Sequence, residues 1–309
     1  MLVSYVIATY NRREELERVL PSVLSQEYEP LEVIIVCNST DDTPDLFEGD
    51  GRFADDDRIR YYHRDERMGV TGARNFGYRK ADGDILVTID DDAVIPDPDA
   101  TARMVELFER DEDTGIAAFR VENHYSGEFE FPYGQSELES RLPFVRPLVD
   151  LDLREAEVPT ETTAYKGCGN AIRASLFEEV GYYPDDFFYG VEEIELSFRA
   201  LDAGYRVMYL PSVRVVHREA PEGRLPDTDM LQGILENRLR TAIWHHPLHY
   251  LLFETILWSG RTVYRTGSLR PVLSAWQTIV GQFGSLWRDR DVLDRETVEY
   301  IHDCGGRLY

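Results

Sequence analysis

The sequence predicts an α/β fold in which helices flank a parallel or mixed sheet, with a helical extension at the C-terminal end. Two apolar segments, residues 3–8 and 31–36, have the composition of strands, and the segment between them carries apolar residues at helical spacing. Strand, helix and strand in this order form the βαβ unit of a parallel sheet. A third apolar segment, residues 85–89, ends at Asp90-Asp91-Asp92.

Length and composition limit the classes of protein that the chain can belong to. Its 309 residues suffice for one large α/β domain with an appendage, or for two domains. The formal net charge is −25, and Lys80 and Lys166 are the only lysines. An acidic, lysine-poor surface suits a salt-loaded cytoplasm, because salt screens its self-repulsion. We therefore expect a halophilic archaeal source and no nucleic-acid partner.

The three cysteines are odd in number and widely spaced. Cys37, Cys168 and Cys304 form no CxxC pair, which favours reduced thiols in a cytosol over a disulfide framework or a zinc motif. The chain enters its first predicted strand directly, so we expect no signal peptide. Both observations predict a cytoplasmic protein.

The first predicted helix follows the turn Thr9-Tyr10-Asn11-Arg12. We expect Asn11 to cap this helix, with Glu14 completing a capping box, and Pro21 to interrupt and kink it. Ligands of parallel sheets bind beyond the carboxyl ends of the strands. The polar segments 9–12 and 37–43 follow the first two strands and are therefore candidates for a ligand site.

The acidic triplet after residues 85–89 is the strongest single feature of the sequence. Three adjacent carboxylates repel one another, so a fold that sets them beside a buried strand needs a cation there. Carboxylates suit Mg²⁺ or Mn²⁺, which in turn hold a substrate diphosphate. The alternative is a solvated acidic loop, which is common in a chain so rich in acid.

Residues 69–77 form a glycine-spaced turn that enters a helix. A helix N-terminus with Arg74 nearby suits a phosphate, whereas the alternative is that these glycines only serve helix packing. The segment matches neither GxGxxG nor the P-loop pattern, so neither a dehydrogenase nor an NTPase follows. Residues 59–63 are predicted to be a further strand.

Four separated motifs resemble those of family 2 glycosyltransferases, which are inverting sugar transferases of the GT-A fold. They are residues 4–12, Asn38-Ser39-Thr40-Asp41, the turn 69–77 with Arg74 and Asn75, and Asp90-Asp91-Asp92. They occur in the family's order over roughly residues 1–220. The resemblance implies a GT-A type, Rossmann-like catalytic domain over residues 1–228. Residues from about 1 to 100 would bind a nucleotide-sugar and those from about 101 to 228 an acceptor.

The resemblance also implies roles for individual residues on the donor side. Asp92 would be the metal-binding end of the DxD motif, with Asp90 near the ribose. The other expected donor-binding residues are Thr9, Asn11, Asn38, Arg74 and Asp91. Cys37 stands where the family usually has an aspartate, which implies a weaker base contact or a different nucleotide.

On the acceptor side, residues 166–171 resemble the family's glycine-rich pocket segment, which implies acceptor contacts for Gly167, Gly169 and Asn170. Residues 187–199 resemble the catalytic-base helix, in which the usual Glu-Asp pair is Glu192-Glu193 here. Carried over residue by residue, the pattern makes Glu193 the base. Inversion needs a base within about 3 Å of the acceptor hydroxyl. The alternative is that both acids merely complement a helix dipole.

The second half is predicted to hold a helix over residues 103–110 and strands over 115–121, 205–210 and 213–216. The last strand ends at His217. A single histidine after a strand usually has a structural role, but the resemblance implies that His217 binds the metal with Asp92. Residues 123–160 are irregular and aromatic, which suits either a variable loop that binds the acceptor or a surface loop without a binding role.

Residues 229–309 form the predicted helical extension. Their nine arginines offset five aspartates and four glutamates, so the whole negative charge belongs to the catalytic part. No apolar run is long enough to span a bilayer. We expect residues 238–287 to lie on the cytoplasmic face of the cell membrane, with arginines meeting phosphates: Arg238, Arg240, Arg261, Arg265 and Arg270. The alternative is an interface between subunits of a homo-oligomer.

Taken together, the resemblance implies transfer of a sugar from a nucleotide-sugar donor, with Mg²⁺ or Mn²⁺ as cofactor. We expect the acceptor to be a polyisoprenoid-linked or cell-envelope glycan, as in protein glycosylation. Two alternatives from other classes stay open. One is a sugar-nucleotide nucleotidyltransferase, although the chain lacks a glycine- and lysine-rich N-terminal phosphate loop. The other is a silent carbohydrate-binding relative.

Overall fold

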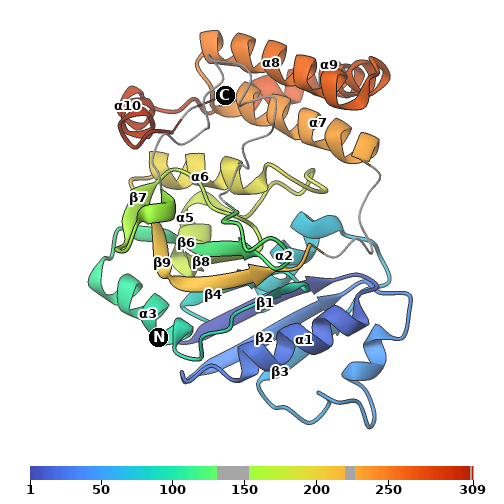
Figure 1. Ribbon diagram of the computed structural model, residues 1–309. Coiled ribbons are helices and arrows are strands. Elements are labelled where there is room, and N and C mark those ends of the chain that lie inside the picture. The colour runs from blue at the N-terminus through green and yellow to red at the C-terminus, as the bar shows by residue number, and fades with distance from the viewer. Residues whose placement is uncertain (131–152, 220–226, 307, 309) are drawn as a thin grey trace.

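The structure is a computed structural model that describes residues 1–130, 153–219, 227–306 and 308. Within these ranges the strands form one nine-stranded mixed sheet (Figure 1). Its first four strands in spatial order are parallel to one another: β3 (Ile59–His63), β2 (Leu31–Cys37), β1 (Val3–Thr9) and β4 (Ile85–Ile89). The predicted βαβ unit is therefore confirmed.

The rest of the sheet is mixed. β8 (Gly169–Arg173) runs antiparallel between β4 and β6 (Thr114–Asn123), and β6 is parallel to β9 (Arg206–His217). Two short strands pair antiparallel with β9, namely β5 (Ala93–Val94) and β7 (Thr160–Thr162). The prediction of two separate strands over residues 205–210 and 213–216 was wrong, because β9 continues through both. A register shift between Phe119 and Arg120 absorbs the irregularity in the pairing with β6.

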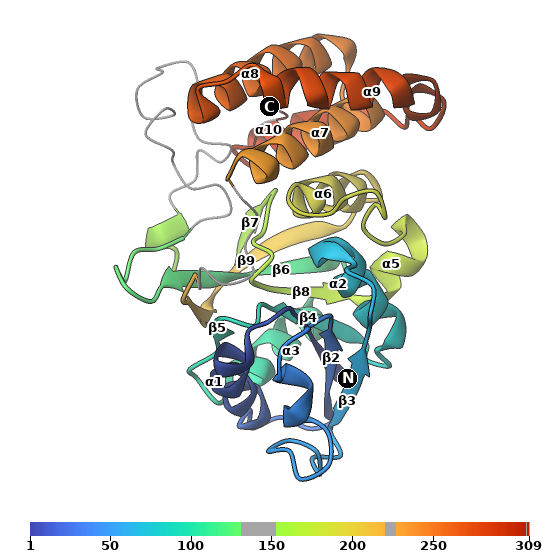
Figure 2. The ribbon, with the colours of Figure 1, turned by 90° about the vertical axis from the view of Figure 1, so that its right-hand side faces the viewer.

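Helices cover both faces of the sheet, which explains why its strands are apolar on both sides (Figure 2). On one face α1 (Arg13–Leu24) and α3 (Ala100–Arg110) pack against Val3, Tyr5 and Ile7. On the other face lie α2 (Gly69–Lys80), α5 (Ala174–Val180) and α6 (Glu192–Asp202), which share a core with Val6. Two short 3₁₀ turns, η1 (Thr43–Leu46) and η2 (Leu153–Glu155), complete this part.

The start of α1 differs from the expectation. Asn11 has a left-handed backbone with φ of 55°, and its side-chain oxygen accepts a hydrogen bond from the Thr40 amide at 2.8 Å. Arg12 takes the N-cap position, without a side-chain capping bond. The expected capping box is therefore wrong, because Asn11 joins two loops instead. The helix continues past Pro21 to Leu24, so Pro21 does not interrupt it.

The C-terminal extension is helical, as expected. α7 (Asp227–His245), α8 (Leu248–Thr266) and α9 (Arg270–Arg288) form a bundle beside α6 (Figure 1). Their common core includes Leu235, Leu239 and Trp258. α10 (Arg295–Asp303) packs back onto the catalytic part, where Ile301 and Leu308 join the core beneath α6. No helix of the described part is long and apolar enough to cross a membrane.

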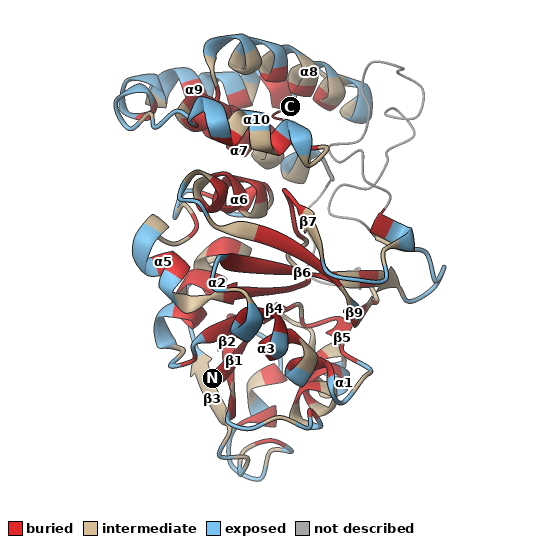
Figure 3. Ribbon diagram, turned by 90° about the vertical axis from the view of Figure 1, so that its left-hand side faces the viewer, coloured by how far each residue is buried: buried red, intermediate tan, exposed pale blue. Residues whose placement is uncertain are grey.

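The outer faces of α8 and α9 are exposed, whereas the sheet is almost fully buried (Figure 3). Most of the irregular segment predicted over residues 123–160 lies at 131–152, outside the described residues. The division of the chain at residue 228 remains a prediction.

Candidate active site

One cavity of about 380 Å³ opens at the carboxyl ends of β1, β2, β4 and β9. This is the edge of the sheet at which the parallel strands were expected to hold a ligand. Most of the predicted site residues line it: Thr9, Asn38, Arg74, Asp90, Asp91, Asp92, Gly167, Glu192, Glu193 and His217. Asn11, Gly169 and Asn170 do not line it.

The acidic triplet follows β4 directly, and arginines face each of its members. Arg74 Nη2 donates to Asp90 Oδ1 at 2.8 Å. Arg12 Nη1 lies 2.7 Å from Asp91 Oδ1 and 3.2 Å from Asp92 Oδ2. Burial raises the pKa of Asp91 to about 6, although Arg12 opposes this shift. The triplet is thus largely buried and ion-paired with arginines, and it is not a solvated acidic loop.

His217 reaches the triplet through strand pairing. β5 pairs with the end of β9 so that Ala93 is opposite His217, which sets the imidazole beside the turn at residues 90–92. His217 Nε2 lies 3.4 Å from Asp92 Oδ1, and its Nδ1 lies 3.0 Å from Glu130 Oε2. Burial disfavours charge on His217, but its contacts with Asp92, Cys168 and Glu130 outweigh burial and raise its pKa.

Glu130 is also bonded by the ammonium group of Lys166. Burial would raise the pKa of Glu130, but the hydrogen bonds from His217 and Lys166 dominate and lower it to about 2. Glu130 therefore orients the ring of His217 from the side opposite Asp92. No sequence motif pointed to Glu130, whereas Lys166 stood out as one of two lysines.

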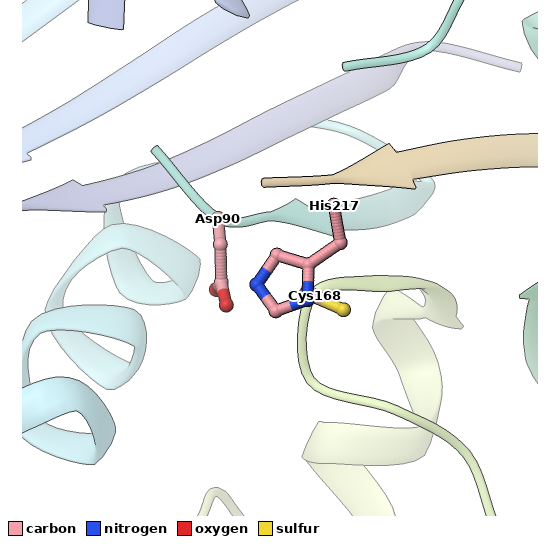
Figure 4. A group of neighbouring side chains, drawn as sticks. All are labelled: Asp90, Cys168 and His217. Atoms are coloured by element: carbon pink, nitrogen blue, oxygen red, sulfur yellow. The ribbon is translucent and has the colours of Figure 1, made fainter. Parts of the chain in front are cut away.

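The donor atoms that converge here suit a divalent cation. Asp90, Cys168 and His217 bring a carboxylate oxygen, a sulfur and an imidazole nitrogen within 4.8 Å of one another (Figure 4). Asp92 adds a second carboxylate beside the same imidazole. Carboxylates and imidazole are the ligands that Mn²⁺ and similar ions take in proteins.

Glu192 and Glu193 are the first two residues of α6 and directly follow a residue with a strained backbone. Val191 has φ of 79°, a left-handed conformation that costs a β-branched residue about 1–3 kcal/mol. Strain of this kind persists where the surroundings fix a functional geometry. The turn at Val191 points Glu192 and Glu193 into the cavity.

Arg74 lies against both carboxylates. Its Nη1 is 3.1 Å from Glu193 Oε1 and 3.4 Å from Glu192 Oε1. Burial, followed by the nearby charge of Glu193, raises the pKa of Glu192 to about 8. Burial also raises the pKa of Glu193, although Arg74 opposes that shift. Glu193 keeps more exposure than Glu192 (15% against 2% of the side chain), so Glu193 is the more accessible of the two acids from the cavity.

Gly167 is needed for close approach. A methyl group at this position would overlap Glu193 Oε1 and lie 2.7 Å from Arg74 Nη1. By contrast, Gly169 packs against Val121 and Val215 inside the sheet. Asn170 Nδ2 donates to the Lys166 carbonyl at 2.8 Å, so Asn170 holds the loop that carries Gly167.

Asn38 and Asn11 organise the loops that follow β2 and β1. Asn38 Nδ2 donates to the carbonyls of Arg64 and Glu66 at 3.1 and 2.6 Å, which ties residues 64–66 to the end of β2. Asn11 links its own turn to Thr40. Thr9 sits at the last position of β1, on the cavity wall.

Sequence reasoning missed several residues of the cavity wall. Arg67 lies over the rings of Tyr10 and Phe188, at 4.7 and 5.5 Å from their centres. α7 supports the same wall, because Asn237 Nδ2 donates to the Gly190 carbonyl at 2.9 Å. The other residues not predicted for the wall include Arg12, Tyr165, Lys166, Cys168, Tyr189 and Met230. Several of these residues lay inside segments that the sequence had already singled out, so their positions were visible although their contacts were not: Arg12, Lys166, Cys168, Phe188 and Tyr189.

Residues 4–181 match the sequence profile of glycosyl transferase family 2. The chain belongs to this family. The poly-beta-1,6-N-acetyl-D-glucosamine synthase of Staphylococcus aureus is 25% identical over 276 residues, which cover 82% of this chain and 61% of that protein. The chain therefore spans about three fifths of that relative. The glucosyl-dolichyl phosphate glucuronosyltransferase of Haloferax volcanii is 36% identical over 115 residues, 37% of this chain and 36% of that protein.

Solved structures share the fold. GalNAc-T7, crystallised with UDP, GalNAc and Mn²⁺, aligns over 78% of this chain and 48% of its own, with a TM-score of 0.62 and 19% identity. A mannosyltransferase from Pyrobaculum calidifontis in complex with GDP-Man and Mn²⁺ aligns over 98% of this chain and 83% of its own, with a TM-score of 0.55 and 19% identity. The predicted GT-A type fold with a helical extension is confirmed.

Proposed function

We propose that this family 2 protein is an inverting, metal-dependent glycosyltransferase that uses a nucleotide-sugar donor. One arrangement carries the proposal: Glu193 and the Asp90–Asp92 turn open into a single cavity, with Arg74 joining Glu193 to Asp90. A transferase of this type needs a base at the acceptor and a cation at the leaving diphosphate. The cavity offers a carboxylate for the first role and an acidic turn that could hold a cation for the second, and both contact Arg74.

Glu193 is the proposed base. Its carboxylate would take the proton of the acceptor hydroxyl as that oxygen attacks the anomeric carbon, while the bond to the leaving diphosphate breaks on the opposite side. Its raised pKa makes it a stronger base than an ordinary glutamate. Arg74 holds the Glu193 carboxylate in place through the 3.1 Å contact.

Asp92 and His217 are the proposed metal ligands, and Mg²⁺ or Mn²⁺ is the proposed cofactor. When bound, the ion would offset the charge that develops on the leaving diphosphate. Arg12 holds Asp91 and Asp92 by ion pairs, and Glu130 orients His217. Two structures of the same fold were determined with Mn²⁺, which supports a divalent cation.

The nucleotide base is proposed to bind between Thr9 and Asn38, with Asn11 shaping the loop and Asp90 near the ribose. Arg67 stacks over Tyr10 next to this region and adds an aromatic and cationic surface for a base. Related structures hold UDP or GDP-Man, so the nucleotide itself stays open. The acceptor is proposed to enter past Gly167, beside Glu193, with Gly169 and Asn170 shaping that loop.

The proposed acceptor is a polyisoprenoid-linked glycan, reached from the cytoplasmic face of the membrane. The outer face of α8 and α9, which we call the α8–α9 face, supports this placement. Its exposed apolar side chains are Leu248, Leu252, Phe253, Ile256, Tyr264, Leu273, Trp276, Val280, Phe283 and Trp287. An apolar surface of this extent is typical of a membrane or protein interface.

The charges of the α8–α9 face favour an anionic membrane. Within residues 248–288 of this very acidic chain there is one acidic residue, Glu254, and it is fully buried. Arg265, Arg270 and Arg288 are exposed on the same helices. The expectation that Arg238 and Arg240 meet lipid phosphates was wrong, because both are buried between the helices.

A homo-oligomer is the alternative for this face. The exposed side chains of α9 recur at residues 273, 276, 280, 283 and 287, a spacing that also suits packing against a helix of a second copy.

The source is proposed to be a halophilic archaeon, on the basis of the acidic composition and the similarity to a Haloferax volcanii protein. A protein glycosylation pathway is the proposed setting.

A donor-cleavage assay tests the reaction class. Reduced, full-length protein is mixed with nucleotide-sugars and Mn²⁺ at high salt, and the released products are identified. Release of nucleoside diphosphate supports a glycosyltransferase. In a parallel reaction with nucleoside triphosphates and sugar 1-phosphates, release of pyrophosphate would instead identify a nucleotidyltransferase. Binding of a nucleotide-sugar without any release would identify a silent relative.

Flotation with vesicles tests the membrane placement. Full-length protein should float with anionic vesicles and not with neutral ones, and a Leu252→Glu, Leu273→Glu variant should stay in solution. Val158→Glu is the matched control, because Val158 is an exposed apolar residue of the catalytic part. Light scattering of the same proteins reports the oligomer. If the wild type never floats and forms an oligomer that the double variant does not form, the α8–α9 face is an interface with a second subunit and not a membrane-binding surface.

A further inference from the structure

Three different donor groups from distant parts of the sequence surround one point at the cavity wall. Asp90 follows β4, Cys168 precedes β8, and His217 ends β9 (Figure 4). Their donor atoms all lie within 4.8 Å of one another. No Cys-x-x-Cys pair marks this group, so the sequence pattern for zinc sites could not reveal it.

Strand register holds the three groups in place. β4 and β8 pair so that Ile89 is opposite Gly169, which makes Asp90 and Cys168 neighbours across the strand ends. β5 and β9 pair so that Ala93 is opposite His217. Cys168 and His217 are buried, and Asp90 is partly open. All three line the cavity, so a bound ion would have an open position toward a ligand.

The donor set differs from that of a magnesium site. Mg²⁺ takes oxygen ligands, whereas a thiolate with an imidazole and a carboxylate suits Zn²⁺ and Co²⁺. Three protein ligands with an open fourth position are typical of reactive zinc sites. In a tetrahedral site, sulfur and nitrogen ligands lie about 3.5 Å apart, so movements of about 1 Å would close the group around an ion.

We propose that Asp90, Cys168 and His217 form a site for a borderline-soft divalent ion such as Zn²⁺ or Co²⁺. Binding forms a metal–sulfur and a metal–nitrogen bond, and the Cys168 thiol and the His217 ring release to solvent the protons that these two donor atoms carry. The site shares His217 with the metal site of the proposed transferase. Only the statement about this shared residue rests on the proposed function. Because both sites need the ring of His217, whose Nδ1 already lies against Glu130, we expect Zn²⁺ and the oxygen-preferring ion to exclude each other.

Cobalt spectroscopy tests the site without any substrate. Co²⁺ is titrated into reduced, full-length protein, and one equivalent should produce the near-ultraviolet thiolate-to-cobalt charge-transfer absorption. Added Zn²⁺ should remove this absorption. Cys168→Ser and Cys168→Ala should abolish it, whereas Cys37→Ser and Cys304→Ser should keep it, and circular dichroism confirms that each variant is folded.

Two results would overturn the proposal: cobalt binding without a charge-transfer absorption, or an absorption that survives in folded Cys168→Ser protein. The measurement uses no donor and no acceptor. A missing absorption therefore leaves the transferase proposal intact, and an inactive transferase leaves the absorption readable.

Discussion

Arg74 Nη1 lies 3.1 Å from Glu193 Oε1, and the Arg74 side chain is only 4% exposed. The same guanidinium donates to Asp90 at 2.8 Å through Nη2. One buried cation thus bridges the proposed base and the acidic turn that ends β4. Its charge favours the ionised form of Glu193, which burial alone would make difficult to reach.

The first prediction concerns the base. Glu193→Gln keeps the shape of the side chain but removes its anion, so turnover should fall by about 10²-fold or more while donor binding persists. Glu192→Gln should have the milder effect, because Glu192 is almost fully enclosed. Steady-state rates and donor titrations of both variants provide the measurement. The reverse ranking would assign the base to Glu192.

The second prediction concerns Gly167. Gly167→Ala adds a methyl group that overlaps the Glu193 carboxylate and must displace it, so kcat should fall by about 10²-fold. Gly233→Ala is the control, since a Cβ there meets nothing within 4 Å and alanine favours α7. Kinetics and circular dichroism of both proteins decide. A normal kcat in the Gly167→Ala variant would mean that Glu193 has room to move.

The third prediction concerns the metal. Asp92→Ala should abolish transfer while leaving the fold intact, because Asp92 is proposed to hold the cation with His217. Excess chelator should do the same to the wild type, with activity returning when Mn²⁺ is added. Full activity in excess chelator would rule out the metal dependence.

The fourth prediction links Glu192 to pH. The folded protein holds the Glu192 proton up to about pH 8, whereas an unfolded chain releases it near the ordinary pKa of about 4.3. Stability from this protonation is fully present below that ordinary pKa and is lost as the pH rises toward 8. Glu192→Gln mimics the protonated acid, so its free energy of unfolding should rise relative to wild type between about pH 5 and pH 8.

Urea unfolding at both pH values and constant salt measures this difference. The control is Glu178→Gln, at a solvent-exposed position of α5. Its difference from wild type should be the same at both pH values. An equally constant difference for Glu192→Gln would show that the folded protein holds no proton on Glu192.

The fifth prediction concerns the helical extension. Arg238 and Glu254 form a buried ion pair at 3.3 Å between α7 and α8, and Arg238 also lies 4.2 Å from the centre of the Trp258 ring. Glu254→Ala leaves a buried positive charge without this carboxylate, so it should cost about 3–5 kcal/mol of unfolding free energy. Glu299→Ala, which removes an exposed partner of Arg295, should change little. Thermal unfolding of both variants measures the two losses of stability, and equal losses would show that the buried Arg238–Glu254 pair matters no more than the exposed one.

The sequence by itself determined the parallel half of the sheet and the position of the site at its edge. Residues 3–8, 31–36 and 85–89 are apolar almost without interruption, since both faces of their strands are covered, and such runs are legible without a structure. Asp90, Asp92 and Glu193 were visible because each belongs to a local motif of adjacent residues. Motifs of adjacent residues can be recognised in a sequence without knowledge of the fold.

Only the tertiary structure decided which of these residues meet and which other residues join them. The pairs Arg12–Asp91, Glu130–His217 and Asp90–Cys168 depend on strand register and loop packing, which no sequence period encodes. Packing also reversed two expectations: Asn11 bonds to Thr40 instead of capping α1, and Arg238 turns inward to Glu254 instead of outward to lipid. A polar side chain takes whichever partner the fold brings within reach, because burial makes an unpaired polar group costly.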